Sequence, residues 1–188
     1  MKNKPYILLA LVAALLLTSL PSGAQIIAVK ANALSWAACT PDIGVEIITG
    51  EHTSVALSAF GHYKPYGAES KVFAVQPEFR YWFNGRPLTR EYIGAAAGLF
   101  IYDSQLFNQV FRGDAISLGI TGGYVFSLGK RWAFELSAGV GLLAFRHKQY
   151  DKGDNYDDYS PGSVMPVNNW GYTIFPTKLN ASFIYIIR

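Results

Sequence analysis

The chain has little cysteine and little charge, and each shortage excludes a class of protein. Only one of its 188 residues, Cys39, is a cysteine, and only 15% are charged. One cysteine cannot form an intramolecular disulfide, so a disulfide-stapled scaffold is excluded. The formal net charge is +3, which lacks the basic surplus of a nucleic-acid-binding surface. We therefore expect no nucleic-acid partner.

Long apolar runs are also scarce. The one such run, residues 6–20, follows Lys2 and Lys4 and precedes the small residues 22–24. This order predicts a secretory signal peptide over residues 1–24, because the run is too short for the roughly 20 residues of a membrane helix. The alternative is a retained membrane anchor. Loss of the two lysines would lower the net charge from +3 to +1 and leave residues 25–188 as one domain.

What fills the remaining chain is alternation. The segment 71–83, KVFAVQPEFRYWF, places Phe79 and Tyr81 on one face of an extended strand and Glu78 and Arg80 on the other. Successive side chains of a strand point to opposite faces, so one face here is aromatic and the other polar. Comparable segments continue to the end of the chain. They predict eight strands, over residues 29–38, 43–49, 53–63, 72–83, 91–102, 115–126, 132–145 and 172–187.

The connections between these strands differ in length. The links after the second, fourth and sixth strands are short and rich in turn residues: 49–52, 84–87 and 127–130. The links after the third, fifth and seventh lengthen progressively: 64–71, 103–114 and 146–171. Short turns at one end and long loops at the other are typical of an outer-membrane barrel, with periplasmic termini and extracellular loops.

Outward positions of the predicted strands are apolar. In the fifth and seventh strands they are Ile93, Ala95, Ala97, Leu99, Ile101, Leu136, Ala138, Val140 and Leu142. Aromatic residues cluster near both strand ends, like two interfacial girdles. No charge lies between Tyr92 and Tyr102. A secreted lipocalin-like barrel, which needs a charged outer wall, is therefore the less favoured alternative.

Two segments do not fit the pattern. Pro77 lies inside the fourth strand, although proline cannot donate a hydrogen bond to a neighbouring strand. We expect a bulge there, or a strand that begins later. In the first strand, Leu34 and Trp36 share a face with Lys30 and Asn32, so either a bulge changes the alternation or that wall is mixed.

Several charged residues should point into the barrel. They are Glu46, Glu78, Arg80, Glu135 and Lys178. The interior of an eight-stranded barrel is just wide enough for side chains, so these groups should meet and pair. We interpret them as a structural plug; a gate, a proton path or a narrow channel are the functional alternatives.

The three histidines raise the question of metal or nucleophile chemistry. No spacing among His52, His62 and His147 matches a metal motif. Small outer-membrane barrels that modify lipid A use a histidine and a serine near the outer leaflet. His62 or His147 could lie there, and Ser58 shares a strand face with His62. A lipid A-modifying hydrolase is thus one alternative, although we predict no catalytic, metal or cofactor site.

The last long loop is the candidate binding segment. It combines carboxylates with tyrosines: Tyr150, Asp151, Asp154, Tyr156, Asp157, Asp158 and Tyr159. Clustered carboxylates could hold calcium, but the spacing is not that of an EF-hand. Loops carry function and tyrosine is enriched at protein interfaces, so we predict an extracellular binding loop.

Three blocks of sequence carry a family resemblance. They are AVKANALSWAACTPDIGVEI, VQPEFRYWFNGRP and PTKLNASFIYIIR. In these the chain resembles an uncharacterised family of small outer-membrane barrels from Bacteroides-type bacteria. The resemblance implies a barrel in the outer membrane, and some members accompany surface-fimbria components. It implies no activity and no site residues. Arg188 follows the alternating Phe183, Tyr185 and Ile187, where such barrels commonly end in an aromatic.

The sequence therefore predicts an all-β protein: an eight-stranded antiparallel up-and-down transmembrane β-barrel behind a cleavable signal peptide. We expect it in the outer membrane of a Gram-negative cell, as a non-enzymatic structural or surface-interaction protein. Its expected partners are outer-membrane lipid, the barrel assembly machinery and a surface or fimbrial protein.

Overall fold

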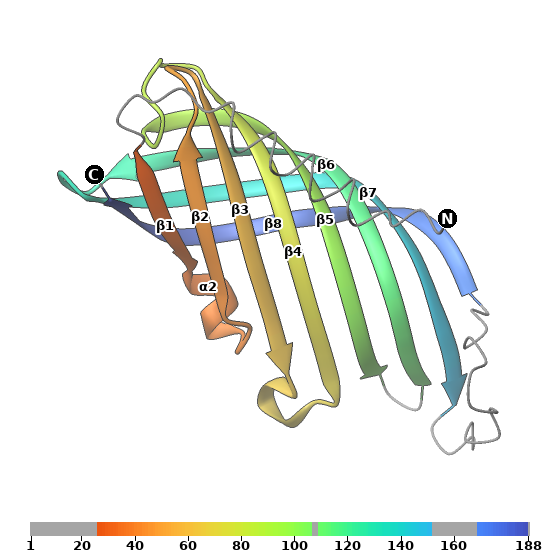
Figure 1. The fold of residues 1–188 in the computed structure, drawn as a ribbon. Helices are drawn as coiled ribbons and strands as arrows, with labels where there is room; N and C mark the ends of the chain where they lie inside the picture. Colours follow the sequence, from red (N-terminus) through yellow and green to blue (C-terminus); the bar gives the residue numbers. More distant parts are fainter. Residues whose placement is uncertain (1–25, 107–108, 152–168, 188) are drawn as a thin grey trace, which may run out of the picture.

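The fold is known from a computed structural model that describes residues 26–106, 109–151 and 169–187. The predicted signal peptide lies outside the described residues. Strands dominate the described chain (Figure 1). The elements are β1 (Ile27–Asn32), α2 (Ala33–Ala37), β2 (Asp42–Ile48), β3 (Thr53–Tyr63), η1 (Pro65–Gly67), β4 (Ser70–Trp82), β5 (Arg90–Leu106), β6 (Gln109–Ser127), β7 (Trp132–Asp151) and β8 (Asn169–Ile187).

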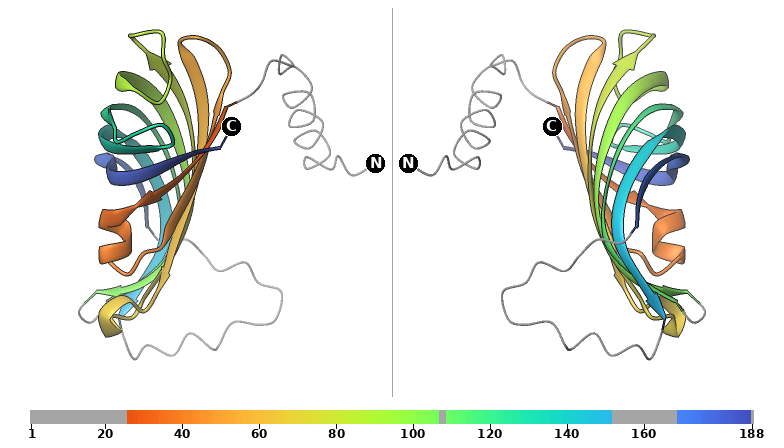
Figure 2. Two further views of the ribbon diagram at one scale, coloured as in Figure 1. Left: turned by 90° about the vertical axis from the view of Figure 1, so that its left-hand side faces the viewer. Right: turned by 90° about the vertical axis from the view of Figure 1, so that its right-hand side faces the viewer.

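These eight strands close into a ring. Each pairs antiparallel with its neighbours in sequence, and β1 pairs with β8 to complete a closed barrel. The two side views in Figure 2 show the strands tilted and curved, with α2 at one side of the wall. The predicted all-β, eight-stranded, up-and-down order is confirmed. No described helix is long and apolar enough to cross a membrane.

The strands on the long-link side are longer than predicted. Residues 103–106 and 109–114, expected to belong to a loop, are part of β5 and β6, whose pairing continues to Leu106 opposite Gln109. Likewise β7 runs to Asp151 and β8 begins at Asn169. The extensions carry charged side chains that pair across strands on the outward face, so their polarity resembles that of a loop although their backbone is extended. The expected steady lengthening of these links is therefore wrong.

The first predicted strand is shorter than expected. It ends at Asn32, and residues 33–37 form the short helix α2. Lys30 and Asn32 are buried inside the barrel, while Leu34 and Trp36 are exposed on the helix. Both expectations for this segment, a bulge and a wall of mixed polarity, are therefore wrong. The second half of the segment is a helix and not part of a strand.

The bulge expected at Pro77 is absent, and β4 begins well before it. Pro77 pairs with Leu57 of β3, and only the pairing toward β5 is interrupted, with an unchanged register on both sides. The missing N–H of Pro77 therefore interrupts the β4–β5 pairing locally without shifting its register. The register shift lies in the β7–β8 ladder, between Gly139 and Gly141, where Pro176 falls on the β8 side.

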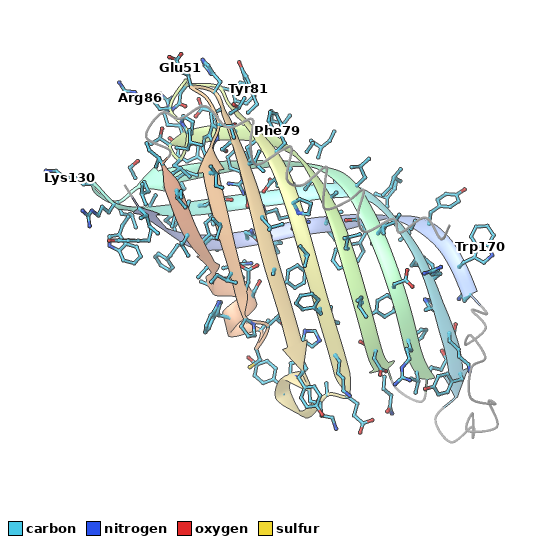
Figure 3. All side chains as sticks on the ribbon, in the orientation of Figure 1. Glu51, Phe79, Tyr81, Arg86, Lys130 and Trp170 are labelled. Carbon is cyan, nitrogen blue, oxygen red and sulfur yellow. The ribbon has the colours of Figure 1, made fainter. Side chains whose placement is uncertain are left out.

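The barrel is apolar outside and polar inside. Along β4, buried and exposed residues alternate, with Phe79 and Tyr81 exposed and Glu78 and Arg80 buried. The labelled Glu51, Arg86 and Lys130 lie at the end with the short links, and Trp170 lies at the opposite end (Figure 3). We call these the short-turn end and the long-loop end.

A small hydrophobic core closes the short-turn end. It consists of Ala28, Trp82, Leu88, Tyr92, Val125, Ala133 and Ile184. Leu88 comes from the link between β4 and β5, has a positive φ of 65°, and is 2% exposed. We call Trp82 and Leu88 together with Tyr92 the apolar lid, because they lie across the interior at this end.

Candidate functional site

The interior next to the apolar lid holds six charged side chains from five strands. They are Lys30 of β1, Glu46 of β2, Glu78 and Arg80 of β4, Glu135 of β7 and Lys178 of β8. All six are buried. Three carboxylates face three cations, so this ion-pair cluster is formally neutral. The five residues expected inside the barrel all belong to it, and Lys30 is an addition.

Arg80 is the centre of the ion-pair cluster. Its Nε and Nη2 donate to Glu78 Oε2 at 2.9 and 2.6 Å. Its Nη1 donates to Glu46 Oε2 at 3.0 Å, and to Glu135 Oε2 at 2.9 Å. The planar guanidinium presents several donors in a rigid fork, which suits it to bind several carboxylates at once. The Tyr92 ring covers one face, with Arg80 Cζ 4.4 Å from its centroid.

The two lysines complete the charge balance. Lys30 donates to Glu135 Oε2 at 2.6 Å and forms an ion pair with Glu46. Lys178 donates to Glu78 Oε2 at 2.5 Å. Each carboxylate therefore contacts two cations, which offsets the large desolvation cost of burying charge.

Neutral donors fill the remaining positions on the carboxylates. Ser54 donates to Glu46, Thr121 donates to Glu78, and Tyr92 donates to Glu135 at 2.7 Å. Sequence reasoning missed these residues. These three residues could have been found from the sequence, because each falls on the inward face of its predicted strand, the face that also carries the buried charges.

Glycine makes room for this packing. A Cβ built on Gly94 would lie 2.6 Å from Thr121 Oγ1 and 3.0 Å from Glu78 Oε1. Contacts that short are not tolerated, so a larger residue at Gly94 would displace the groups that bind Glu78. The small inward faces seen in the sequence thus allow side chains from opposite walls to meet.

The ion-pair cluster is arranged to hold charge, not to react. Its carboxylates are bound by cations and hydroxyls, which leaves no free acid or base for proton transfer. The cavity that borders Lys30, Glu78, Arg80 and Lys178 has a volume of about 20 Å³, room for about one water molecule. The cluster lies in the interior beside the apolar lid, near the short-turn end.

The histidines all lie outside the ion-pair cluster. His52 lies in the β2–β3 turn, and its Nδ1 is 2.7 Å from the carbonyl oxygen of Trp82. The Nδ1 of His147 is 2.9 Å from the Tyr102 hydroxyl. His62 uses both ring nitrogens: Nδ1 is 3.1 Å from Thr40 Oγ1 and Nε2 is 3.0 Å from Ser70 Oγ. Ser58, the expected partner of His62, instead contacts the Gln76 carbonyl at 3.4 Å.

The predicted binding loop is only partly described. Tyr150 lies near the end of β7, with Lys148 Nζ 5.7 Å from its ring centroid, and Asp151 is the last residue of that strand. The other members fall outside the described residues: Asp154, Tyr156, Asp157, Asp158 and Tyr159. Across the described part of the chain, no three His, Cys, Asp or Glu side chains are arranged to hold a metal ion.

Cys39 follows α2 in an exposed turn with a positive φ of 52°. Tyr66 of η1 lies beside it and donates to the Ala37 carbonyl. A side-chain hydrogen bond with Cys39 raises the pKa of the Tyr66 hydroxyl above its ordinary value. These contacts attach η1 to the turn after α2 at the long-loop end.

Comparison with known proteins identifies a family but no characterised relative. A search of curated proteins finds no match, and a search of solved structures finds none either. A family model described as a protein of unknown function, DUF3575, matches residues 7–187. Because the match spans nearly the whole sequence, this chain belongs to the DUF3575 family.

Proposed function

We propose that this chain is an outer-membrane barrel with a plugged bore, and that it serves as a structural or surface-interaction protein rather than as an enzyme or a channel. The observation that carries the proposal is the inverted distribution of polarity. Buried ion pairs fill the inside, and large apolar side chains cover the outside. Lipid is the solvent that stabilises such an exterior.

The outward apolar band supports membrane insertion. Leu118 is 69% exposed, and Leu99, Ile120 and Leu142 are exposed to a similar degree. Water-soluble monomers rarely expose a contiguous apolar surface of this kind. Along β7 the band runs from Phe134 to Ala144, eleven residues, before the outward Arg146. A tilted membrane strand needs about 9–11 residues.

The ends of the long strands support a role at the cell surface. Beyond the apolar band, Arg112 pairs with Asp103 at 2.6 Å, and Arg146 pairs with Asp114 at 2.9 Å. These paired charges mark hairpins that project past the lipid into water. Such projecting hairpins would present a surface to a fimbrial or other surface protein.

A gel assay combined with cell fractionation tests the placement. Folded outer-membrane barrels resist unfolding by detergent until boiled, so the unboiled protein should migrate differently from the boiled one. The protein should also sediment with outer membranes. Recovery in the soluble periplasm, with one migration position, would contradict membrane insertion and favour a lipocalin-like barrel.

One contact favours a second candidate, a lipid-directed serine hydrolase. Thr40 donates its hydroxyl proton to the Ala38 carbonyl at 3.2 Å, so its oxygen accepts from His62 Nδ1. His62 Nε2 then accepts the proton of Ser70 Oγ, 3.0 Å away, when Ser104 Oγ, 2.7 Å from Ser70 Oγ, donates to it. This is the arrangement of a nucleophile and its base, in which Ser70 would attack an ester carbonyl and His62 would pass the proton to the leaving alcohol.

Mass spectrometry of lipid A separates the two candidates. A hydrolase would change the acylation pattern between cells with and without the gene, and Ser70→Ala would abolish the change. Ser58→Ala is the matched control, because Ser58 does not contact His62. An identical lipid A profile in all strains would eliminate the second candidate.

A further inference from the structure

The ring of strands is closed by an unusually short seam. β1 pairs with β8 over six residues, from Ile27 opposite Ile187 to Asn32 opposite Ser182. The β6–β7 ladder, in contrast, includes all 19 residues of β6. β1 and β2 are visibly shorter than the strands across the barrel (Figure 1). The wall is therefore incomplete on one side of its long-loop half.

Asn32 ends the seam. Its side chain accepts from the Ala181 N–H at 3.1 Å and donates to the Leu179 carbonyl at 3.4 Å, which imitates one more rung of backbone pairing. The same side chain oxygen accepts from the Leu34 N–H and so caps α2. Beyond this point the chain forms α2, which contacts β8 but does not pair with it as a strand.

β8 continues past the seam with one edge unpaired. Among the described strands, residues 169–181 of β8 pair only with β7. Gln76 of β4 reaches across to donate to the Thr177 carbonyl at 3.1 Å, and Pro176 has no N–H to satisfy. Ile174 lies opposite Leu142, inside the proposed lipid band. An open edge is tolerated at that depth only where it is buried in protein or lines a water-filled cavity.

A cavity lies at this gap. Its volume is about 290 Å³, at the lower end of the ~300–1,000 Å³ typical of small-ligand sites. Its lining includes Leu34 and Leu179, which are 48% and 70% exposed, together with the buried Gln76 and Lys178. The lining thus combines exposed side chains with interior ones, as expected where the wall is interrupted.

The cavity is apolar at its mouth and polar at its floor. Leu34 and Leu179 form the mouth, while Asp42, Thr177 and Asn180 contribute polar groups. Asp42 is buried and forms no ion pair within the described residues, and the buried Thr177 hydroxyl has no hydrogen-bond partner there. Lys178, the cation at the floor, is already bound to Glu78. The floor thus favours an uncharged, hydroxylated group over an anion.

We infer that this gap between α2 and β8 is a lateral binding site for a single-chain lipid with an uncharged, hydroxylated head group, such as a monoacylglycerol. The head group hydrogen-bonds the floor, and the acyl chain leaves through the gap into the outer leaflet. The inference rests on the proposed membrane placement and adds a ligand to it.

Trp36 allows a direct test. Its indole donates to the Asp42 carbonyl at 3.0 Å, which holds the ring beside the gap. The mature protein in phospholipid nanodiscs is titrated with a monoacylglycerol that carries bromine near its carbonyl end, and bromine quenches nearby tryptophan. Trp36→Phe identifies the contribution of that ring. We expect quenching that saturates at one lipid per protein.

Matched variants keep the test specific. Ser58→Phe fills the cavity, which Ser58 lines, and should weaken binding at least tenfold. Val55→Phe adds the same ring to the same strand outside the cavity, where Val55 is exposed, and should change binding less than twofold. Unboiled gel migration verifies that both variants fold.

Three outcomes would overturn the inference. Quenching that rises without saturation and is equal in all variants would mean contact with bulk lipid only. Two protein copies per disc, with no lipid site, would mean that a second copy covers the β8 edge. A protein that never enters the discs would reject the membrane placement as well, so the two failures are distinguishable.

Discussion

The two ends of the barrel differ in how completely they are built. At the short-turn end, the apolar lid and the ion-pair cluster give nearly every interior group a partner. At the long-loop end, β1 has ended, α2 follows it, and residues 169–181 of β8 pair with β7 alone among the described strands. We therefore expect substitutions at the short-turn end to destabilise the protein most, and contacts with lipid or protein to involve the long-loop end.

The largest expected effect comes from removing the centre of the closed end. Arg80→Met should lower the free energy of unfolding by about 3–5 kcal/mol, because three buried carboxylates would be left with two lysines. Urea unfolding of the refolded protein in detergent micelles, followed by tryptophan fluorescence, measures the change.

Arg146→Met is the matched control for that measurement. Arg146 also binds a carboxylate, Asp114, but both are exposed, so its loss should cost only ~0–1 kcal/mol. Equal effects of the two substitutions would refute the contrast between the two ends.

The next effect concerns the outer wall. Val140→Arg or Leu136→Arg should destabilise the protein by roughly 2–4 kcal/mol if these outward sites lie near mid-bilayer. Unfolding in lipid vesicles measures it. Leu128→Arg is the control, because Leu128 is exposed in the link between β6 and β7 at the short-turn end. Harmless arginines at both 136 and 140 would show that this wall does not face lipid.

A smaller effect tests the boundary between the two ends. Asn32→Ala removes the cap of α2 and the last polar link of the seam, and should cost about 1–2 kcal/mol. Ser35→Ala removes only the contact from Asn32 Nδ2 to Ser35 Oγ at 2.6 Å and should cost less. The comparison uses the same urea titration. An Asn32→Ala variant as stable as the parent would mean that the seam does not depend on this side chain.

The smallest expected signal is electrical. A bore filled by the ion-pair cluster and the apolar lid should give no unitary conductance steps in planar lipid bilayers. Gly129→Ala, in the link between β6 and β7 where an added Cβ would meet nothing within 4 Å, should leave that baseline unchanged. Well-defined steps from the parent protein would favour a narrow channel over a plugged barrel.

The alternation of polar and apolar residues predicts the strand architecture well. Successive side chains of a strand face opposite sides of the sheet, so the pattern can be recognised without knowing which strands pair. Residues 53–63 were assigned to a strand with the bounds that the structure has. The resemblance to an uncharacterised family is also confirmed by the match to DUF3575. Burial and pairing of Glu46 with Arg80 follow the same logic, since both fall on an inward face.

The errors come from residues whose role depends on distant partners. Arg112 and Asp103 looked like loop residues, but they stabilise each other across two strands. Nothing local in the sequence distinguishes Pro77, which leaves the register intact, from Pro176, which lies at the register shift. The sequence does not place Lys30 in the interior, because the helix after Asn32 interrupts the alternation of a strand only six residues long.

The short seam also has a kinetic consequence. Every other ladder joins strands adjacent in sequence, whereas Ile27 must find Ile187 at the opposite end of the described chain. Contacts between remote residues carry the largest loop-closure cost, and this ladder has only six residue pairs to offset it. The β1–β8 pairing should therefore form last during folding and open first, so its amide protons should exchange with solvent sooner than those of the β6–β7 ladder.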